Sequence, residues 1–192
     1  MTFIVLEGGE GSGKSTQARL LAGALGAVLT HEPGATSVGR LLRELVLGME
    51  SEALDPRAEA LVLLADRAQH VAAVVRPALD AGRTVVCDRF SGSTLAYQGY
   101  GRGLDLAELA GMSRWASAGL EPGLVVLLDV AEGRLAAPTD RMEAEDAAFH
   151  RRVADGYRAL AAADPGRWAV VDGSGTVEEV AALVRKAVDE RL

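Results

Sequence analysis

One short stretch near the start of the chain, Gly8 to Ser15, limits the possible folds and functions more than any other. Its sequence, GGEGSGKS, satisfies the pattern G-x-x-x-x-G-K-[ST]. The apolar run from Thr2 to Leu6 is predicted to form a buried strand, and the segment from Lys14 to Leu25 a helix. A strand, a glycine-rich turn and a helix in this order are the context in which the pattern forms a phosphate-binding loop, or P-loop.

The residue types in this loop suit a nucleoside triphosphate. Its glycines allow backbone conformations that a Cβ would forbid, so that successive N–H groups can face phosphate oxygens at a helix N-terminus. Lys14 would reach the β- and γ-phosphates, and the Ser15 hydroxyl would bind Mg²⁺. A glycine turn without a ligand has no need for a lysine and a hydroxyl at these offsets. The candidate ATP-binding residues are Gly8, Gly9, Glu10, Gly11, Ser12, Gly13, Lys14, Ser15 and Thr16.

The composition is that of a soluble globular protein. Of the 192 residues, 49% are hydrophobic and 24% are charged, and no apolar run approaches the roughly 18 residues of a membrane span. No signal peptide is recognisable, so we expect a cytoplasmic location. The formal net charge of −7 argues against a nucleic-acid polymer as partner, because such binding requires a basic surface. A mononucleotide needs only a locally basic pocket.

Cysteine and histidine chemistry is not indicated. The single cysteine, Cys87, lies in an apolar run and is expected to be a packed thiol. The histidines, at positions 31, 70 and 150, are far apart in the sequence and lack ligand spacing, so we expect no metal cluster built from them.

Apolar runs alternate with helical periodicities along the chain. The predicted strands cover residues 2–6, 27–30, 84–88, 124–129 and 168–171, with helices between them. The run from Leu124 to Leu128 is unbroken in its hydrophobicity, as expected for a strand that is covered on both faces. The order predicts an α/β fold, in which residues 1–192 form a single domain of the P-loop NTPase type around a five-stranded parallel sheet flanked by helices.

Several local features are also predicted. Ser37 is expected to cap a helix that carries Arg40 and Arg43, and residues 143–163 to form another helix. The segment from Ser91 to Gly103, rich in hydroxyl, amide and glycine residues, is interpreted as reading a base and not as core.

A helix is predicted to begin after Asp55 and Pro56, with two sets of residues that each share one face of the helix. We expect Leu61, Leu64, Ala68, Val71 and Val75 to face the core, and Leu63, Arg67 and His70 to share a face that could look into a cleft.

The remaining motifs favour a small phosphotransferase over other P-loop proteins. The guanine-reading motif of GTPases requires a lysine, but the only lysines are Lys14 and Lys186, and neither lies in such a motif. Several arginines are predicted near the edges of the cleft, as a phosphoryl-transfer site requires for positioning two polyanions. These arginines are Arg43, Arg67, Arg89, Arg134 and Arg141.

Taken together, the motifs resemble the thymidylate kinases of bacteria over nearly the whole chain. The resemblance is carried by the P-loop, by HEPG at 31–34, ADRA at 65–68, DRF at 88–90, STLAYQGYGRG at 93–103 and DRME at 140–143. It implies transfer of the ATP γ-phosphate to dTMP, giving dTDP and ADP, with Mg²⁺ and as a homodimer. It also implies a lid, here a short segment near residues 131–141.

The resemblance also implies roles for individual residues. Glu10 would meet the sugar 3′-hydroxyl and Tyr97 would lie beside the sugar, while Arg43 and Arg89 would hold the acceptor phosphate. Arg67, Thr94 and Gln98 match positions that address thymine. Lys14, Arg89, Arg134 and Arg141 are the candidate catalytic residues, and Ser15 and Asp88 the candidate Mg²⁺ ligands, the latter through water. Asp88 could instead orient Arg89, and both roles stay open.

Three departures from the family pattern bear on the function. His31 stands where an arginine is usual, and Leu63 stands where an aromatic side chain usually stacks on thymine. The lid is short and poor in arginine, so Arg134 and Arg141 must supply most of its charge. Two alternatives therefore stay open: a kinase for another small (deoxy)nucleoside monophosphate, and a nucleotide-binding protein without catalysis.

Overall fold

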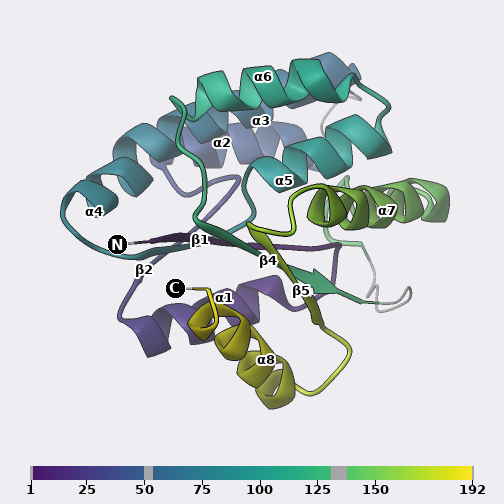
Figure 1. Cartoon of the computed structure of the whole chain (residues 1–192). Coiled ribbons are helices and arrows are strands. Elements are labelled where there is room, and N and C mark those ends of the chain that lie inside the picture. Colours follow the sequence, from purple (N-terminus) through teal and green to yellow (C-terminus); the bar gives the residue numbers. More distant parts are fainter. Residues whose placement is uncertain (1, 50–53, 131–137, 192) are drawn as a thin grey trace.

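Five parallel strands form the centre of the molecule, in the order β2-β3-β1-β4-β5 (Figure 1). The computed structural model describes residues 2–49, 54–130 and 138–191. The strands are β1 (Phe3–Glu7), β2 (Val28–His31), β3 (Val85–Asp88), β4 (Leu124–Asp129) and β5 (Trp168–Asp172). This arrangement confirms the predicted α/β class and the five-stranded parallel sheet.

Helices cover both faces of the three central strands, which explains why β1, β3 and β4 are buried almost throughout. The edge strands β2 and β5 keep exposed positions. Ile4 and Leu6 of β1 pack toward α1 (Lys14–Leu25) and α8 (Val177–Asp189), whereas Phe3 and Val5 point to the opposite face. Figure 1 shows α1 and α8 together below the sheet and the other helices above it. These are α2 (Ser37–Leu47), α3 (Pro56–His70), the π-helical turn η1 (Val71–Val75), α4 (Arg76–Asp80), α5 (Ser91–Thr94), the π-helical turn η2 (Leu95–Gly101), α6 (Leu106–Ala116) and α7 (Ala147–Ala163).

Two helix starts differ from the prediction. Thr36, and not Ser37, caps α2, because its backbone is extended and its side chain accepts a hydrogen bond from Gly39 N at 2.9 Å. Helix α7 begins at Ala147 and not at residue 143, since Asp140 accepts hydrogen bonds from the backbone N–H groups of residues 142 and 143 and holds that segment in turns.

Leu61 does not face the core, as its stripe predicted, but is 55% exposed. Leu64, Val71 and Val75 of the same stripe are buried, and Ala60 takes the core position one residue before Leu61. The spacing of three and four residues is shared by neighbouring stripes of a helix, so the pattern alone did not separate them.

The segment from Ser91 to Gly103 is also more than a polar surface segment. It is helical, as α5 and η2, and Ala96, Gly99 and Gly101 are buried. A Cβ on Gly99 would lie 2.4 Å from Leu106 Cδ2, and one on Gly101 would lie 2.7 Å from the Phe149 ring. Its glycines therefore let it pack closely against α6 and α7, so the segment is both core and pocket wall.

The carboxyl ends of β2, β1 and β3 meet at one edge of the sheet. Asp88 is in register with both Leu6 and His31. The P-loop leaves β1 at this edge, where open α/β sheets bind their ligands. Within the described ranges, no helix combines the length and the apolar character needed to cross a membrane.

Candidate active site

The P-loop connects β1 to α1 through glycines that no other residue could replace without strain. Gly8, Gly11 and Gly13 have φ angles of 149°, 67° and 85°, which favour glycine. A Cβ on Gly8 would lie 2.6 Å from the Leu128 carbonyl oxygen. Gly13 caps α1 without a side-chain hydrogen bond, so the first N–H groups of the helix are left for a ligand. Such a helix start is suited to phosphate.

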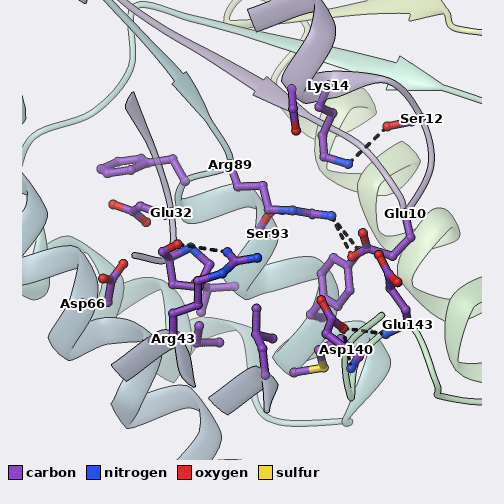
Figure 2. A pocket seen from close by; sticks show the side chains of 18 of the residues that line it. Glu10, Ser12, Lys14, Glu32, Arg43, Asp66, Arg89, Ser93, Asp140 and Glu143 are labelled. Carbon is purple, nitrogen blue, oxygen red and sulfur yellow. Dashed lines mark hydrogen bonds and ion pairs between the residues drawn. The ribbon is translucent and has the colours of Figure 1, made fainter. Parts of the chain in front are cut away.

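Lys14 folds back over this loop. Its Nζ donates to the Gly9 carbonyl at 2.5 Å and to Ser12 Oγ at 3.2 Å, as Figure 2 shows for Ser12. Burial, followed by the charge of Arg89, lowers the pKa of Lys14 to about 8. An ammonium group buried beside another cation is a ready partner for an anion.

Ser15 and Asp88 form a small oxygen-donor site beside the loop. The Ser15 hydroxyl donates to Asp88 Oδ2 at 2.5 Å, and Asp88 Oδ1 is buried with no hydrogen-bond partner among the described residues. No group of three or more acidic, histidine or cysteine side chains in the described ranges could hold a metal by itself. The pair therefore fits Mg²⁺, which takes few protein oxygens and completes its shell with water and phosphate.

Arg89 lies between the P-loop and η2. Its backbone is left-handed, with a φ of 70°, and the carboxylate of Glu7 holds it there by accepting from the next N–H, that of Phe90, at 3.0 Å. The guanidinium donates to Glu10 Oε1 at 2.7 Å (Figure 2). It also donates to the Tyr97 hydroxyl at 3.2 Å. The Tyr97 hydroxyl also donates to Glu10, at 2.6 Å.

The charge on Glu10 is maintained by these neighbours. Burial by itself would raise the pKa of this carboxyl, but the charges of Arg89 and Lys14, together with the hydrogen bonds from Tyr97 and Arg89, lower the pKa to about 2. The P-loop thus carries a fixed negative charge beside the arginine that is expected to hold an acceptor phosphate.

Arg67 is held at the other end of the site, 3% exposed. Its Nε and Nη2 both lie 2.9 Å from Glu32 Oε2, and its Nη1 donates to Thr94 Oγ1 and Ser113 Oγ, each at 2.9 Å. The guanidinium also lies over the Phe90 ring, 4.9 Å from its centroid. Of the five N–H donors of an arginine, these contacts use four and leave one for a ligand.

Gln98 is fully buried in the wall of the same site. Its Nε2 donates to Glu59 Oε1 at 2.9 Å, while its Oε1 has no hydrogen-bond partner among the described residues. A buried carbonyl oxygen without a partner is costly unless a ligand supplies an N–H.

One cavity of about 460 Å³ brings most of the expected residues together. Figure 2 shows how Lys14, Glu10, Arg89 and Arg43 point toward it from different elements. The expected residues that line it are Glu10, Gly11, Ser12, Gly13, Lys14, Ser15, Thr16, Arg43, Leu63, Arg67, Arg89, Thr94, Tyr97 and Gln98.

Four expected residues are placed differently. Gly8, Gly9 and Asp88 shape the loop and its surroundings without lining the cavity. Arg141 does not reach the cavity either, because its guanidinium donates to the Val46 carbonyl and to Glu59 Oε2, each at 3.0 Å. The structure thus departs from the expected catalytic position of Arg141. Arg134, and most of the predicted lid, lie outside the described residues.

The base end of the cavity is the end lined by Arg67, Thr94 and Gln98. Two departures from the family pattern can also be placed, Leu63 in the cavity wall and His31 at the end of β2, in register with Asp88. Leu63 lines the cavity, and its branched aliphatic side chain offers no ring on which a base could stack. Desolvation and the nearby charge of Arg43 lower the pKa of His31, so this residue does not replace the missing arginine charge at neutral pH.

Sequence reasoning missed a set of buried polar residues at the cavity wall, of which Glu32 lines the cavity itself. His70 was placed on a cleft face, but it is fully buried, 2.9 Å from Glu32 and 2.6 Å from Thr30. Glu59 could have been found, since it lies four residues before Leu63 and eight before Arg67, on one face of α3. The other members, Glu7, Glu32 and Tyr157, carry no comparable signal.

Comparisons with known proteins agree with this geometry. The family model described as thymidylate kinase matches residues 6–184. The thymidylate kinase of Solidesulfovibrio magneticus is 47% identical over 208 residues, covering 99% of this chain and 100% of that protein. That of Leifsonia xyli subsp. xyli is 50% identical over 202 residues, covering 99% and 95%.

A solved structure supports the same assignment. The crystal structure of thymidylate kinase from Ehrlichia chaffeensis superposes with a TM-score of 0.84 at 32% identity and covers 97% of this chain and 98% of that one. The similarity thus extends over the P-loop, the base end and the helices between them, and the chain belongs to the thymidylate kinase family.

Proposed function

We propose that this chain transfers the γ-phosphate of ATP to dTMP, giving dTDP and ADP, and that residues 1–192 act as one catalytic domain. The observation that carries the proposal is that one cavity is lined by the P-loop Lys14 and by the base-end residues Arg67, Thr94 and Gln98. A triphosphate at the loop and a monophosphate extending from the base end would meet beside Arg89. The names of the relatives, all thymidylate kinases, support the same substrates.

The base end favours a 4-oxopyrimidine with a hydrogen on N3. Arg67 has one N–H left, and the Thr94 hydroxyl, which accepts from Arg67 at 2.9 Å, keeps its own hydrogen to donate. Both can serve a carbonyl oxygen such as O4. The free Oε1 of Gln98 can accept from N3–H. Cytosine presents the opposite pattern at both positions.

The charged groups of the cavity would position the two phosphates. The loop N–H groups and Lys14 would bind the ATP phosphates, while Arg43 and Arg89 would hold the acceptor phosphate, and Glu10 and Tyr97 the sugar. Catalysis of phosphoryl transfer is mostly such positioning together with stabilisation of the charge on the transferred group. Arg134 is assigned to that charge from the sequence alone, and Arg141 is assigned to supporting the wall of the cavity.

Mg²⁺ fits the oxygen donors beside the loop, with Ser15 as ligand and Asp88 acting through water. When bound, it would neutralise charge on the ATP phosphates. The hydrogen bond of Asp88 to Ser15 supports this role over that of orienting Arg89.

We also propose that the protein acts in the cytoplasm as a homodimer. The support is an apolar surface on α2, α3 and α6, where Trp115 is 85% exposed beside Leu61 and Met112. Exposed apolar patches can mark protein–protein interaction sites, and the net charge of −7 argues against a nucleic-acid polymer as the partner.

The function is tested by incubating the purified protein with ATP, Mg²⁺ and one monophosphate at a time from dTMP, dUMP, dCMP and dGMP. We expect dTMP to be phosphorylated with the highest kcat/KM, and Lys14→Ala to abolish turnover. Preference for another monophosphate would assign a different kinase. ATP binding without turnover on any monophosphate would assign a non-catalytic nucleotide-binding protein.

A further inference from the structure

We propose that Glu59 is a positioning residue that determines base specificity, because it fixes the Gln98 side-chain amide with its carbonyl oxygen toward the base. The inference rests on the proposed function, since it concerns how the same cavity would tell thymine from cytosine. Glu59 itself does not line the cavity.

Glu59 is a fully buried carboxylate with four hydrogen-bond donors around it. Its Oε1 accepts from Gln98 Nε2 at 2.9 Å and from Arg102 Nε at 3.2 Å. Its Oε2 accepts from Arg102 Nη2 and from Arg141 Nη2, each at 3.0 Å. Two guanidinium groups therefore surround the carboxylate, and an ionised carboxylate can only accept hydrogen bonds.

This environment allows only one orientation of the Gln98 amide. An amide group has a donor end and an acceptor end of nearly the same shape. If the amide were reversed, its oxygen would lie about 2.9 Å from the Glu59 oxygen, and two acceptors would face each other. The NH₂ end therefore stays on Glu59, and the carbonyl end is left for the cavity.

The free end of the amide shows what it would recognise. Gln98 lines the cavity, it is 1% exposed, and its Oε1 has no hydrogen-bond partner in the part of the chain that the structure describes. An N–H donor on the ligand would satisfy this oxygen. Thymine and uracil carry that donor at N3, whereas cytosine has an acceptor there and would leave two buried acceptors opposed.

Arg102 offers a matched control. It donates twice to Glu59 but makes no hydrogen bond with Gln98. Its other side-chain contacts are an ion pair with Glu145 at 2.6 Å, a hydrogen bond to Met142 Sδ at 3.5 Å and a stack on Phe149 at 4.7 Å. Arg102→Gln thus disturbs the same buried network and leaves the contact between Glu59 and Gln98 in place.

The experiment measures dissociation constants of dTMP and dCMP by titration calorimetry, together with the melting temperature, for the wild type, Glu59→Gln, Glu59→Asp and Arg102→Gln. In Glu59→Gln the new side chain can offer either end of its own amide to Gln98. In Glu59→Asp the charge needed by the arginines is kept, but the carboxylate is drawn back by one methylene.

We expect both Glu59 variants to lower the preference for dTMP over dCMP by about tenfold or more, the cost of one unpaired buried polar group. Arg102→Gln should lower the melting temperature and change the preference by less than about twofold.

The outcomes separate this inference from the proposed function. A wild type that does not prefer dTMP overturns both. A wild type that prefers dTMP, with Glu59 variants that melt earlier but keep the wild-type preference, assigns Glu59 a merely structural role and overturns the inference alone. Should Glu59→Gln fail to fold, the charge-conserving Glu59→Asp decides the question by the same ratio.

Discussion

Lys14 should make the binding of ATP sensitive to pH between 7.5 and 9. The pKa of its ammonium group is lowered to about 8 in the free protein by burial, and next by the charge of Arg89. Bound phosphates would supply the missing counter-charge and raise the pKa of Lys14 in the complex. When the pKa of a group is higher in the complex than in the free protein, the ligand binds most tightly below the pKa of the free protein. The affinity for the ligand then falls as the pH rises through that pKa.

The size of the effect follows from the free pKa. With a pKa of about 8, roughly three quarters of Lys14 is charged at pH 7.5 and about one tenth at pH 9. If the phosphates bind only the charged form, the dissociation constant for Mg-ATP should rise about eightfold over this range. The phosphates of Mg-ATP are already fully ionised at pH 7.5. Binding at pH 8.5 should therefore be accompanied by the uptake of about three quarters of a proton.

Titration calorimetry in buffers of different ionisation enthalpy measures both the affinity and the proton uptake. Lys14→Arg is the matched control, because a guanidinium stays charged throughout this range and should give a flat profile whatever its absolute affinity. A flat profile in the wild type, or the same slope in Lys14→Arg, would refute the reasoning.

Three further predictions concern other parts of the molecule. Leu63→Phe should lower the KM for dTMP by about fivefold or more, since base–aromatic stacking is worth ~1–3 kcal/mol; a steady-state KM that is unchanged or higher would show that the cavity does not admit a stacked ring. Arg134→Ala should lower kcat much more than it weakens dTMP binding, which single-turnover rates and dTMP titrations would measure. Loss of dTMP affinity with an unchanged kcat would contradict a role of Arg134 on the transferred phosphoryl group. Trp115→Glu should shift the sedimentation coefficient from dimer to monomer, and persistence of the dimer would place the interface elsewhere.

The sheet and the phosphate end of the site could be predicted because their signals are local. All five predicted runs are strands, the central three of them buried almost throughout, and the loop from Gly8 to Ser15 carries its glycines, lysine and hydroxyl within eight positions. The base end was predictable only in part. Arg67, Thr94 and Gln98 were found by resemblance, and nothing in their immediate sequence states which of their donors and acceptors remain free.

At the site, what the sequence did not show has one physical cause, which is that the partner of a buried polar group is far away in the sequence. Arg141 was expected at the transferred phosphate from its place beside the lid, yet Glu59, 82 positions earlier, binds its guanidinium. Glu7 has no signal in the sequence beyond its place after an apolar run, but it holds Phe90, 83 positions later. Periodicity reports the environment of a residue along one element, whereas these contacts arise where elements are packed together.

The buried carboxylates explain how an acidic chain builds a pocket for two polyanions. Each of three glutamates holds one ligand-facing residue: Glu7 fixes the backbone next to Arg89, Glu32 holds the guanidinium of Arg67, and Glu59 orients the amide of Gln98. The ligand-facing groups are therefore held in place before a substrate arrives, which is what phosphoryl transfer by positioning requires.

The same arrangement links substrate binding to the stability of the fold. Removal of one partner from a buried ion pair costs about 3–5 kcal/mol of stability. Loss of activity on replacing Arg67 would therefore combine lost base contacts with the loss of the guanidinium partner of Glu32. Separate measurements of the melting temperature and of the preference between bases are needed to distinguish the lost base contacts from the lost stability.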